Sequence, residues 1–342
     1  MKLMPHDRKH LFTKCMSVGY YPEATCPHWL KFLDDIFMHD AEMIHFIHKA
    51  LGYSITGSVK EQCIFIMYGT GSNGKSTFCK HISKILGSYA VNISAAVLMA
   101  KQNTNIDPEL HRLRGARFVT CAETGEGKKL SPAQVKQLTS DDTITAKMLY
   151  CEPFDFVPTG KIWMATNHKP NIPETDHGTW RRIKLIPFLR VISYGERDLQ
   201  LDTKLESEYE GILAWMVRGC ELWAAEGLGT CKAITECTEE YQSEQDIVGQ
   251  FLNEQCEFDP SYMIQTSDIY EAYEQWCFKN GYKWAANQRR LGDYLKSKNY
   301  HKTRATSGMQ KGCFFWYGIT TKNQSNKSEG SEDIDKSTGR PY

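Results

Sequence analysis

The residues with the clearest chemical meaning form a glycine-rich loop. Residues 69–77 read Gly-Thr-Gly-Ser-Asn-Gly-Lys-Ser-Thr and fit the P-loop pattern, in which backbone N–H groups cradle phosphates. In such a loop Lys75 reaches the β- and γ-phosphates, and the Ser76 hydroxyl helps to hold Mg²⁺. The pattern therefore predicts a site for ATP and Mg²⁺. Its residues are Gly69, Thr70, Gly71, Ser72, Asn73, Gly74, Lys75, Ser76 and Thr77.

The elements on either side of this loop support the prediction. The apolar run 63–68 predicts a buried strand, and residues 75–86 predict a helix. A helix N-terminus directs free N–H groups and a positive dipole toward an anion. This context disfavours a chance glycine-rich turn, but the loop alone does not define which nucleotide-using enzyme contains it.

A carboxylate follows a second apolar run. Residues 117–122 predict a strand that ends at Glu123, as in a Walker B element. Such an acid orders Mg²⁺ or polarises the attacking water. Many P-loop enzymes carry two acids here, whereas Ala122 leaves Glu123 alone in this chain. The simpler alternative is an ordinary glutamate at a strand end.

Two further polar groups lie beside predicted strands. Strand 161–166 ends at Asn167, whose amide can donate to a γ-phosphate and accept from the lytic water. Asparagine is also a frequent turn residue, and spacing alone favours that simpler role. Arg181 and Arg182 precede the apolar strand 183–188, where they form either an arginine finger for a neighbouring subunit or a surface ion pair.

Residues 143–156 predict a hairpin with its turn near 151–153. Lys147 would pair with a phosphate and Tyr150 would pack on a base or sugar, which is how channels for single-stranded DNA bind their ligand. The alternative is a structural hairpin with an exposed lysine.

The C-terminal part of the chain is locally basic. Nine Lys and Arg residues and one acid, Asp293, lie between Lys279 and Lys311. Helices predicted near 249–258, 267–280 and 287–297, with strands near 299–304 and 312–319, would form a winged helix. A solvated face or a protein-docking wing are the alternatives. The candidate DNA contacts are Arg289, Arg290, Lys296, Lys302 and Arg304.

Composition sets broader limits. The 342 residues carry 41 basic and 41 acidic side chains, so a nucleic-acid partner must be argued from local clusters. Twelve scattered cysteines without a C-x-x-C pair disfavour zinc and are typical of reduced thiols. The sequence shows neither a signal-peptide core nor an apolar run of the ~20 residues that a membrane span needs. We expect a cytoplasmic protein.

The organisation expected along the chain is simple. Residues 1–58 predict helices, 59–190 alternate strands with helices, and 199–224 predict an amphipathic helix. A short polar region near 228–247 leads to the basic unit. The polar tail 321–342 is expected to be disordered.

Together these motifs resemble the helicase part of the phage and poxvirus primase–helicase family, in helicase superfamily 3 of the AAA+ class. They follow the family's order, and the basic unit resembles its C-terminal winged helix. The matching stretches are 20–27, 32–33, 52–57, the P-loop with Asn73, 113–117 leading to 123–124, 136–139, 141–147, 165–170 and 180–182.

The resemblance implies an α/β fold, with an AAA+ P-loop ATPase core between an N-terminal helical collar and a C-terminal winged helix. The corresponding ranges are 1–58 for the collar, 59–225 for the core, 226–320 for the linker and winged helix, and 321–342 for the tail. The resemblance also implies a hexameric ring that hydrolyses ATP between subunits. Such a ring moves 3′ to 5′ on single-stranded or forked DNA, in the cytoplasm of a bacterial host or of a virus-infected cell. A primase or polymerase would be a further partner. Asn167 becomes sensor 1. The arginine pair becomes the finger, with Arg182 favoured because it directly precedes the strand.

Two other functions remain open. An origin initiator or loader would use ATP only to assemble on DNA and would depend mainly on the winged helix, whereas a motor needs Lys147 and Tyr150 in its channel. A P-loop kinase of a small metabolite is disfavoured by the arginine pair and the basic unit. The sequence does not decide whether the chain is a separate helicase or a piece of a primase–helicase.

Overall fold

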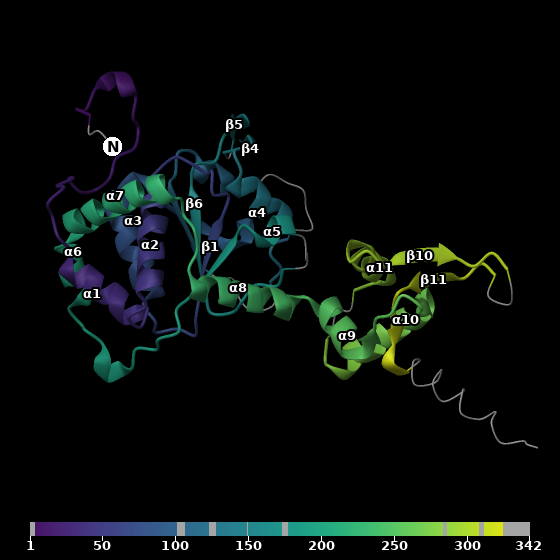
Figure 1. The fold of residues 1–342 in the computed structure, drawn as a ribbon. Helices are drawn as coiled ribbons and strands as arrows, with labels where there is room; N and C mark the ends of the chain where they lie inside the picture. The colour runs from purple at the N-terminus through teal and green to yellow at the C-terminus, as the bar shows by residue number, and fades with distance from the viewer. Residues whose placement is uncertain are drawn as a thin grey trace, which may run out of the picture. The chain divides into compact units, whose positions relative to one another are not determined.

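The computed structural model describes residues 4–100, 107–122, 128–148, 150–172, 177–282, 286–307 and 311–323 (Figure 1). The chain divides into two compact units, Met1–Gln245 and Asp246–Tyr342. Each unit has its own hydrophobic core, and they are described separately.

A five-stranded parallel sheet forms the centre of the first unit. The strand order is β2-β3-β6-β1-β7. β1 lies between β6 and β7, with Met67 opposite both Ala165 and Ile186. The predicted strands are confirmed, whereas the edge strand β2 was not expected. The bounds are β1 Ile64–Tyr68, β2 Ala90–Ser94, β3 Phe118–Ala122, β6 Lys161–Thr166 and β7 Ile183–Pro187.

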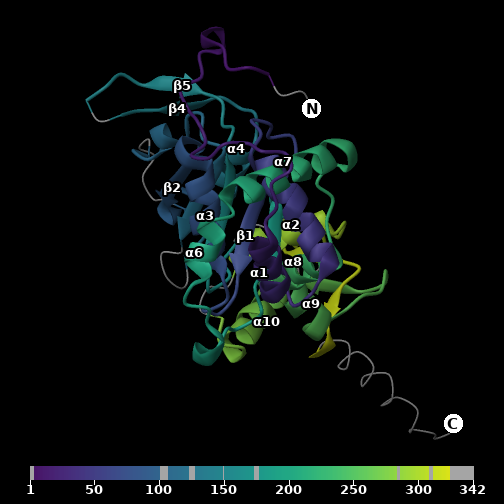
Figure 2. The same cartoon turned by 90° about the vertical axis from the view of Figure 1, so that its left-hand side faces the viewer.

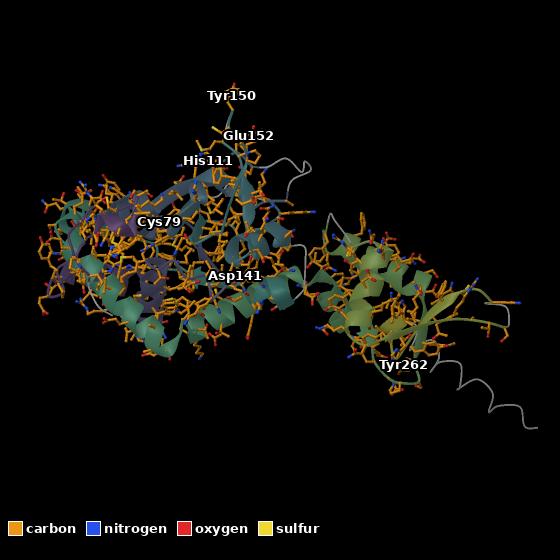
Figure 3. The ribbon with its side chains drawn as sticks, turned by 90° about the horizontal axis from the view of Figure 1, so that it is seen from above. Cys79, His111, Asp141, Tyr150, Glu152 and Tyr262 are labelled. Atoms are coloured by element: carbon orange, nitrogen blue, oxygen red, sulfur yellow. The ribbon has the colours of Figure 1, made fainter. Side chains whose placement is uncertain are left out.

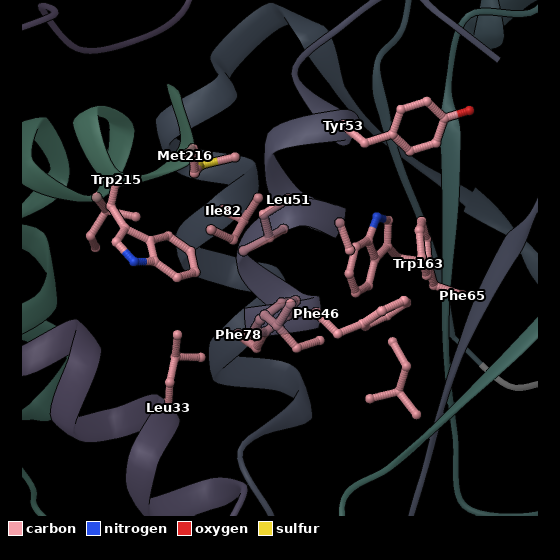
Figure 4. Packing of buried hydrophobic residues seen from close by; sticks show 14 of the residues in the cluster. Leu33, Phe46, Leu51, Tyr53, Phe65, Phe78, Ile82, Trp163, Trp215 and Met216 are labelled. Atoms are coloured by element: carbon pink, nitrogen blue, oxygen red, sulfur yellow. The ribbon is translucent and has the colours of Figure 1, made fainter. Parts of the chain in front are cut away.

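Both faces of this sheet are covered, which explains why its central strands are apolar throughout. Side chains alternate between two clusters: Phe65 and Met67 of β1 point to one, and Ile64 and Ile66 to the other. The first cluster holds side chains of α1 (Pro27–Ile36), α2 (Ala41–Ser54), α3 (Lys75–Leu86) and α7 (Tyr209–Glu226). Figure 4 shows Phe46, Phe78 and Trp163 packed there.

The N-terminal helices are part of the first unit, whereas the sequence suggested a separate collar over 1–58. Only the short 3₁₀ helix η1 (Arg8–His10) precedes α1 among residues 4–26. α1 and α2 then contribute Trp29, Phe46 and Leu51 to the core that the sheet shares. Their burial against the sheet is why this segment is not compact by itself.

The region near 228–247 is a helix, not a short polar linker. α8 (Lys232–Gln245) packs against β7, and Thr238 Oγ1 accepts a hydrogen bond from Leu185 N at 3.3 Å. Ile234 and Tyr241 are its buried residues. α8 therefore belongs to the first unit, so the boundary falls after Gln245 instead of near residue 225.

The second unit contains the three expected helices and the expected strand pair. Its core includes Phe251, Tyr273, Leu291, Leu295 and Trp316. A third strand, β9, joins β10 and β11 in an antiparallel sheet of order β10-β11-β9. The bounds are α9 Ile247–Gln255, α10 Thr266–Lys279, α11 Gln288–Ser297, β8 Cys256–Glu257, β9 Met263–Gln265, β10 His301–Arg304, β11 Phe314–Tyr317 and β12 Thr320–Thr321.

The remaining elements are short. The predicted hairpin is confirmed as an antiparallel pair, β4 with β5. No helix in the described part of the chain is long and apolar enough to cross a membrane. Residues 324–342 of the predicted tail lie outside the described residues. The bounds are β4 Ile144–Ala146, β5 Phe154–Phe156, α4 Pro132–Thr139, α5 His177–Trp180, α6 Leu201–Glu206, η2 Gly87–Tyr89, η3 Ala95–Val97, η4 Leu110–Leu113 and η5 Tyr194–Glu196.

Candidate nucleotide site and nucleic-acid surfaces

The glycine loop connects β1 to α3 and adopts a conformation that depends on its sequence. Gly74 precedes α3 with φ +87°, a region that glycine tolerates without strain. A Cβ atom at Gly74 would also lie 2.8 Å from Ile36 Cγ2 of α1. Both constraints favour glycine here, so α1 contributes to the shape of the loop.

Lys75 lies at the start of α3 with only 6% of its surface exposed. Its Nζ donates to Gly69 O at 2.5 Å, to Asn73 Oδ1 at 3.1 Å and to Asn167 Oδ1 at 3.2 Å. The first two acceptors belong to the loop itself, and the third lies 92 residues away in sequence. The structure thus brings the predicted residue Asn167 to the predicted glycine loop.

Asn167 follows β6, the neighbour of β1, which explains the contact with Lys75. β3 lies on the other side of β6, with Ala122 opposite Ala165. The predicted acid Glu123 comes next in sequence, but it lies outside the described residues.

The described residues supply one of the oxygen ligands that a magnesium ion would need beside the glycine loop. Ser76 is exposed in the first turn of α3, and a hydroxyl is a hard oxygen ligand of the kind that Mg²⁺ accepts alongside phosphate oxygens. Among the described residues, no cluster of three or more His, Cys, Asp or Glu side chains could hold a metal by itself.

The two arginines of the predicted finger differ in burial: Arg182 is buried and Arg181 is exposed. Arg182 is 8% exposed, and it donates to Gly178 O at 2.6 Å and to Gln62 Oε1 at 3.2 Å. Arg181 is exposed, and its Nη2 donates to the same Gln62 oxygen at 3.0 Å. These bonds hold the Arg182 side chain within the chain's own fold, whereas Arg181 lies at the surface.

Thiol chemistry is disfavoured next to the loop. Cys79 lies on α3 and Cys121 on β3, and burial raises the pKa of each thiol from 9.0 to about 12. Because the thiolate is the reactive form, both cysteines are inert packing residues at neutral pH.

The β4–β5 hairpin extends from the body of the first unit (Figure 2). Lys147 is exposed next to β4, and Tyr150 is 95% exposed in the turn (Figure 3). Thr145 Oγ1 donates to Asp155 Oδ1 at 2.7 Å across the strand pair. Both predicted DNA contacts thus lie on one exposed turn.

The basic surface of the second unit forms a groove between α11 and the β10–β11 pair. Its volume is about 260 Å³, and its lining includes Arg289, Lys296, Lys302 and Trp316. Lys302 Nζ lies 4.8 Å from the centre of the Phe314 ring, and the Arg304 guanidinium lies 5.8 Å from the same ring. Cations beside exposed aromatic rings match the chemistry of nucleic-acid surfaces. Arg290 is exposed on α11, but it does not line this groove.

One contact to the glycine loop was not predicted. Arg197 Nη2 donates to Ser72 Oγ at 3.0 Å, although 125 residues separate them. Ile192 N also donates to Ser72 O at 2.8 Å. No sequence pattern predicts these contacts of Ile192 and Arg197 with the glycine loop, because they depend only on β7 lying beside β1.

These features define a parallel α/β protein whose glycine loop, lysine and strand-end amide meet at one edge of the sheet. Residues 1–38 match a family described as D5 N terminal like, and residues 243–337 match one described as Poxvirus D5 protein-like. Residues 67–182, which include the glycine loop, match a family of unknown function, DUF5906.

The relatives are viral proteins. The chain is 27% identical over 287 residues to a protein of Acanthamoeba polyphaga mimivirus that is named a putative helicase, covering 76% of this chain and 29% of the relative. It is 26% identical over 273 residues to a Frog virus 3 protein with the same kind of name, covering 73% and 28%. A protein of African swine fever virus (strain Badajoz 1971 Vero-adapted), named a putative primase, is 26% identical over 302 residues, covering 80% and 31%.

The matches to the two D5-like families and to viral proteins named putative helicase or primase support the viral primase–helicase family for this chain. It spans about 30% of the length of the curated relatives that it matches. The apo structure of the NrS-1 C terminal region has a similar fold, with a TM-score of 0.58 at 14% identity, covering 90% of this chain and 79% of that one.

Proposed function

We propose that this chain is a ring-forming, ATP-dependent DNA helicase that translocates 3′ to 5′ on single-stranded DNA during viral or mobile-element replication. The contact that carries the proposal is the 3.2 Å hydrogen bond from Lys75 Nζ to Asn167 Oδ1. It unites a phosphate-binding lysine with an amide able to sense the γ-phosphate. The viral helicase and primase names of the relatives support the replication context.

In this proposal each predicted site residue has a separate role. The backbone N–H groups of the loop and the N-terminus of α3 bind the β- and γ-phosphates. Lys75 neutralises charge on the γ-phosphate, and the Asn167 amide orients the attacking water. Ser76 and Glu123 would hold Mg²⁺, which supplies charge neutralisation between the phosphates when it is bound.

We assign the trans-acting finger to Arg181 instead of Arg182. A finger must leave its own subunit to reach a neighbour's γ-phosphate, and Arg181 is the exposed member of the pair. Arg182 would orient it indirectly, because both side chains donate to Gln62 Oε1. The heterologous interface that a finger requires closes into a ring, which the family resemblance makes a hexamer.

DNA would contact the ring at the β4–β5 turn. Lys147 offers a charge to the phosphate backbone, and the exposed Tyr150 ring offers a surface on which a base can stack. Removing one stacking ring costs about 1–3 kcal/mol per base in such channels.

The decisive experiment is steady-state ATP hydrolysis with and without single-stranded DNA. We expect DNA to stimulate the wild type strongly, Lys75→Ala to abolish turnover, and Tyr150→Ala to keep basal turnover while losing stimulation. The matched control is Tyr21→Ala, an exposed tyrosine of the first unit outside the hairpin. Turnover in the wild type that ignores DNA would contradict the motor.

The groove of the second unit supports a second candidate, an origin initiator or loader. Arg289, Lys296 and Lys302 line it, so DNA binding could depend on this unit alone. For a loader, Lys302→Ala would abolish DNA binding and Tyr150→Ala would leave it intact. For the motor, Tyr150→Ala would abolish unwinding even when binding is kept.

A further inference from the structure

The segment between β7 and α6, residues 189–200, contacts the glycine loop directly, and we call it the strap. It approaches the loop at Ser72, a non-glycine residue with φ +49°. Ile192 N donates to Ser72 O at 2.8 Å, and Arg197 Nη2 donates to Ser72 Oγ at 3.0 Å. Two hydrogen bonds from one segment therefore hold this left-handed residue of the loop.

The charges of the strap are paired, except at Arg197. Glu196 lies 3.7 Å from Arg190, and Asp198 accepts a 2.6 Å hydrogen bond from Lys204. Among the described carboxylates, none lies within ion-pair distance of Arg197, which is exposed next to the N-terminal end of α3. A guanidinium without a counterion adds to the positive potential of a helix N-terminus, and both favour an anionic ligand.

The strand order indicates which end of a nucleotide this arginine would meet. Lys75 contacts Asn167 on the β6 side of β1, where the γ-phosphate belongs in the proposed function. The strap follows β7, on the opposite side of β1. A nucleotide bound along the loop therefore has its terminal phosphate toward β6 and its inner phosphates and nucleoside toward the strap.

We propose that Arg197 is a nucleotide-binding residue that contacts the inner phosphates of ATP or ADP from the strap. The inference rests on the proposed function, because it needs phosphates in the glycine loop. It goes beyond it by assigning a binding residue outside the P-loop, Walker B and sensor positions. Arg197 would retain its ligand after γ-phosphate release, because the inner phosphates are common to ATP and ADP.

The test is the equilibrium binding of a fluorescent ATP analogue and of its ADP counterpart. We expect Arg197→Ala to weaken both by about tenfold or more, since a charge-assisted hydrogen bond is lost, and Arg197→Lys to recover part of the affinity. Arg218→Ala is the matched control. It removes the same charge from α7, where the guanidinium donates to Pro22 O at 3.0 Å, and should leave both affinities unchanged.

A purely structural role makes a different prediction. If Arg197 acts only by holding Ser72, then Ser72→Ala reproduces the loss and the double variant Ser72→Ala/Arg197→Ala is no weaker than either single one. That result would overturn the proposal. A loss confined to ATP would also overturn it, because it would place Arg197 at the γ-phosphate.

Failure of this inference can be distinguished from failure of the proposed function. If the wild type binds nucleotide, Lys75→Ala does not and Arg197→Ala binds normally, the inference alone is wrong. If the wild type binds neither analogue, the proposed function fails as well.

Discussion

His48 illustrates how a single residue links protonation to stability. Its ring stacks on Trp215 with centroids 4.0 Å apart, and Nε2 donates to Trp215 O at 2.7 Å. Burial, together with nearby Arg218 and His45, lowers the pKa of His48 from 6.5 to about 4 despite that hydrogen bond. The folded protein therefore holds the imidazole neutral at pH values where the unfolded chain protonates it.

We expect His48 to make folding acid-sensitive. Its contribution is fully present above pH 6.5 and is lost as the pH falls toward 4, because the unfolded state then binds more protons. The shift corresponds to about 3 kcal/mol at most. Urea denaturation of wild type and His48→Gln at pH 7.0 and 4.5 measures it. An equal pH dependence in both proteins would contradict the prediction.

At the scale of elements, α2 and α7 cross at two glycines. A Cβ atom on Gly52 would lie 2.1 Å from Cys220 N, and one on Gly219 would lie 2.2 Å from His48 O. Neither distance is compatible with a side chain, so the two helices approach to backbone contact. This crossing joins the N-terminal helices to the core.

Gly52→Ala should destabilise the first unit. The helix gains about 1 kcal/mol in propensity, but overpacking against the α7 backbone costs about 3 kcal/mol, so the loss outweighs the gain. The midpoint of urea denaturation is the measurement. Gly195→Ala is the matched control, because a Cβ there meets nothing within 4 Å. Equal midpoints for the two variants would contradict the close crossing.

The end of α8 is attached to the loop that contains Asn167. Lys169 Nζ lies 2.9 Å from both carboxylate oxygens of Glu244, and Ile172 N donates to Gln245 Oε1 at 3.1 Å. The buried Tyr241 hydroxyl donates to Pro170 O. α8 thus restrains the loop that contains Asn167 immediately before the chain enters the second unit.

We therefore expect Glu244→Gln to slow ATP turnover, because the loop that contains Asn167 is then less firmly held. The rate should fall about fivefold while nucleotide affinity is kept, because the loop loses an ion pair distant from the phosphates. Glu236→Gln is the control on the same helix. Its partner Lys232 lies 3.7 Å away, and both side chains are exposed. Similar rates for the two variants would show that the attachment does not affect catalysis.

At the scale of the whole molecule, a finger acting in trans predicts complementation between two inactive proteins. Lys75→Ala subunits keep Arg181, and Arg181→Ala subunits keep the glycine loop. In a 1:1 mixture about a quarter of the interfaces would combine an intact loop with an intact finger, if neighbours assemble at random. ATP turnover of the mixture is the measurement. A mixture as inactive as its components would contradict a shared site.

The sequence by itself determined the local parts of this protein. The strand, glycine loop and helix around Lys75 are contiguous, and hydrophobic runs marked four of the five strands of the sheet. The hairpin of Lys147 and Tyr150 and the helices of the basic unit were also predictable, since short-range periodicity encodes them. The edge strand β2 and the helix α8 were missed, because their patterns are weak and their packing on the sheet stabilises them.

Only the tertiary structure decided which distant residues meet. Lys75 contacts Asn167 because β6 lies beside β1, and Arg197 reaches Ser72 because β7 lies on the other side. The different burial of Arg181 and Arg182 likewise depends on Gln62 and Gly178, which no spacing rule connects to them. Strand order is set by the packing of the whole sheet, so it is not readable from local sequence patterns.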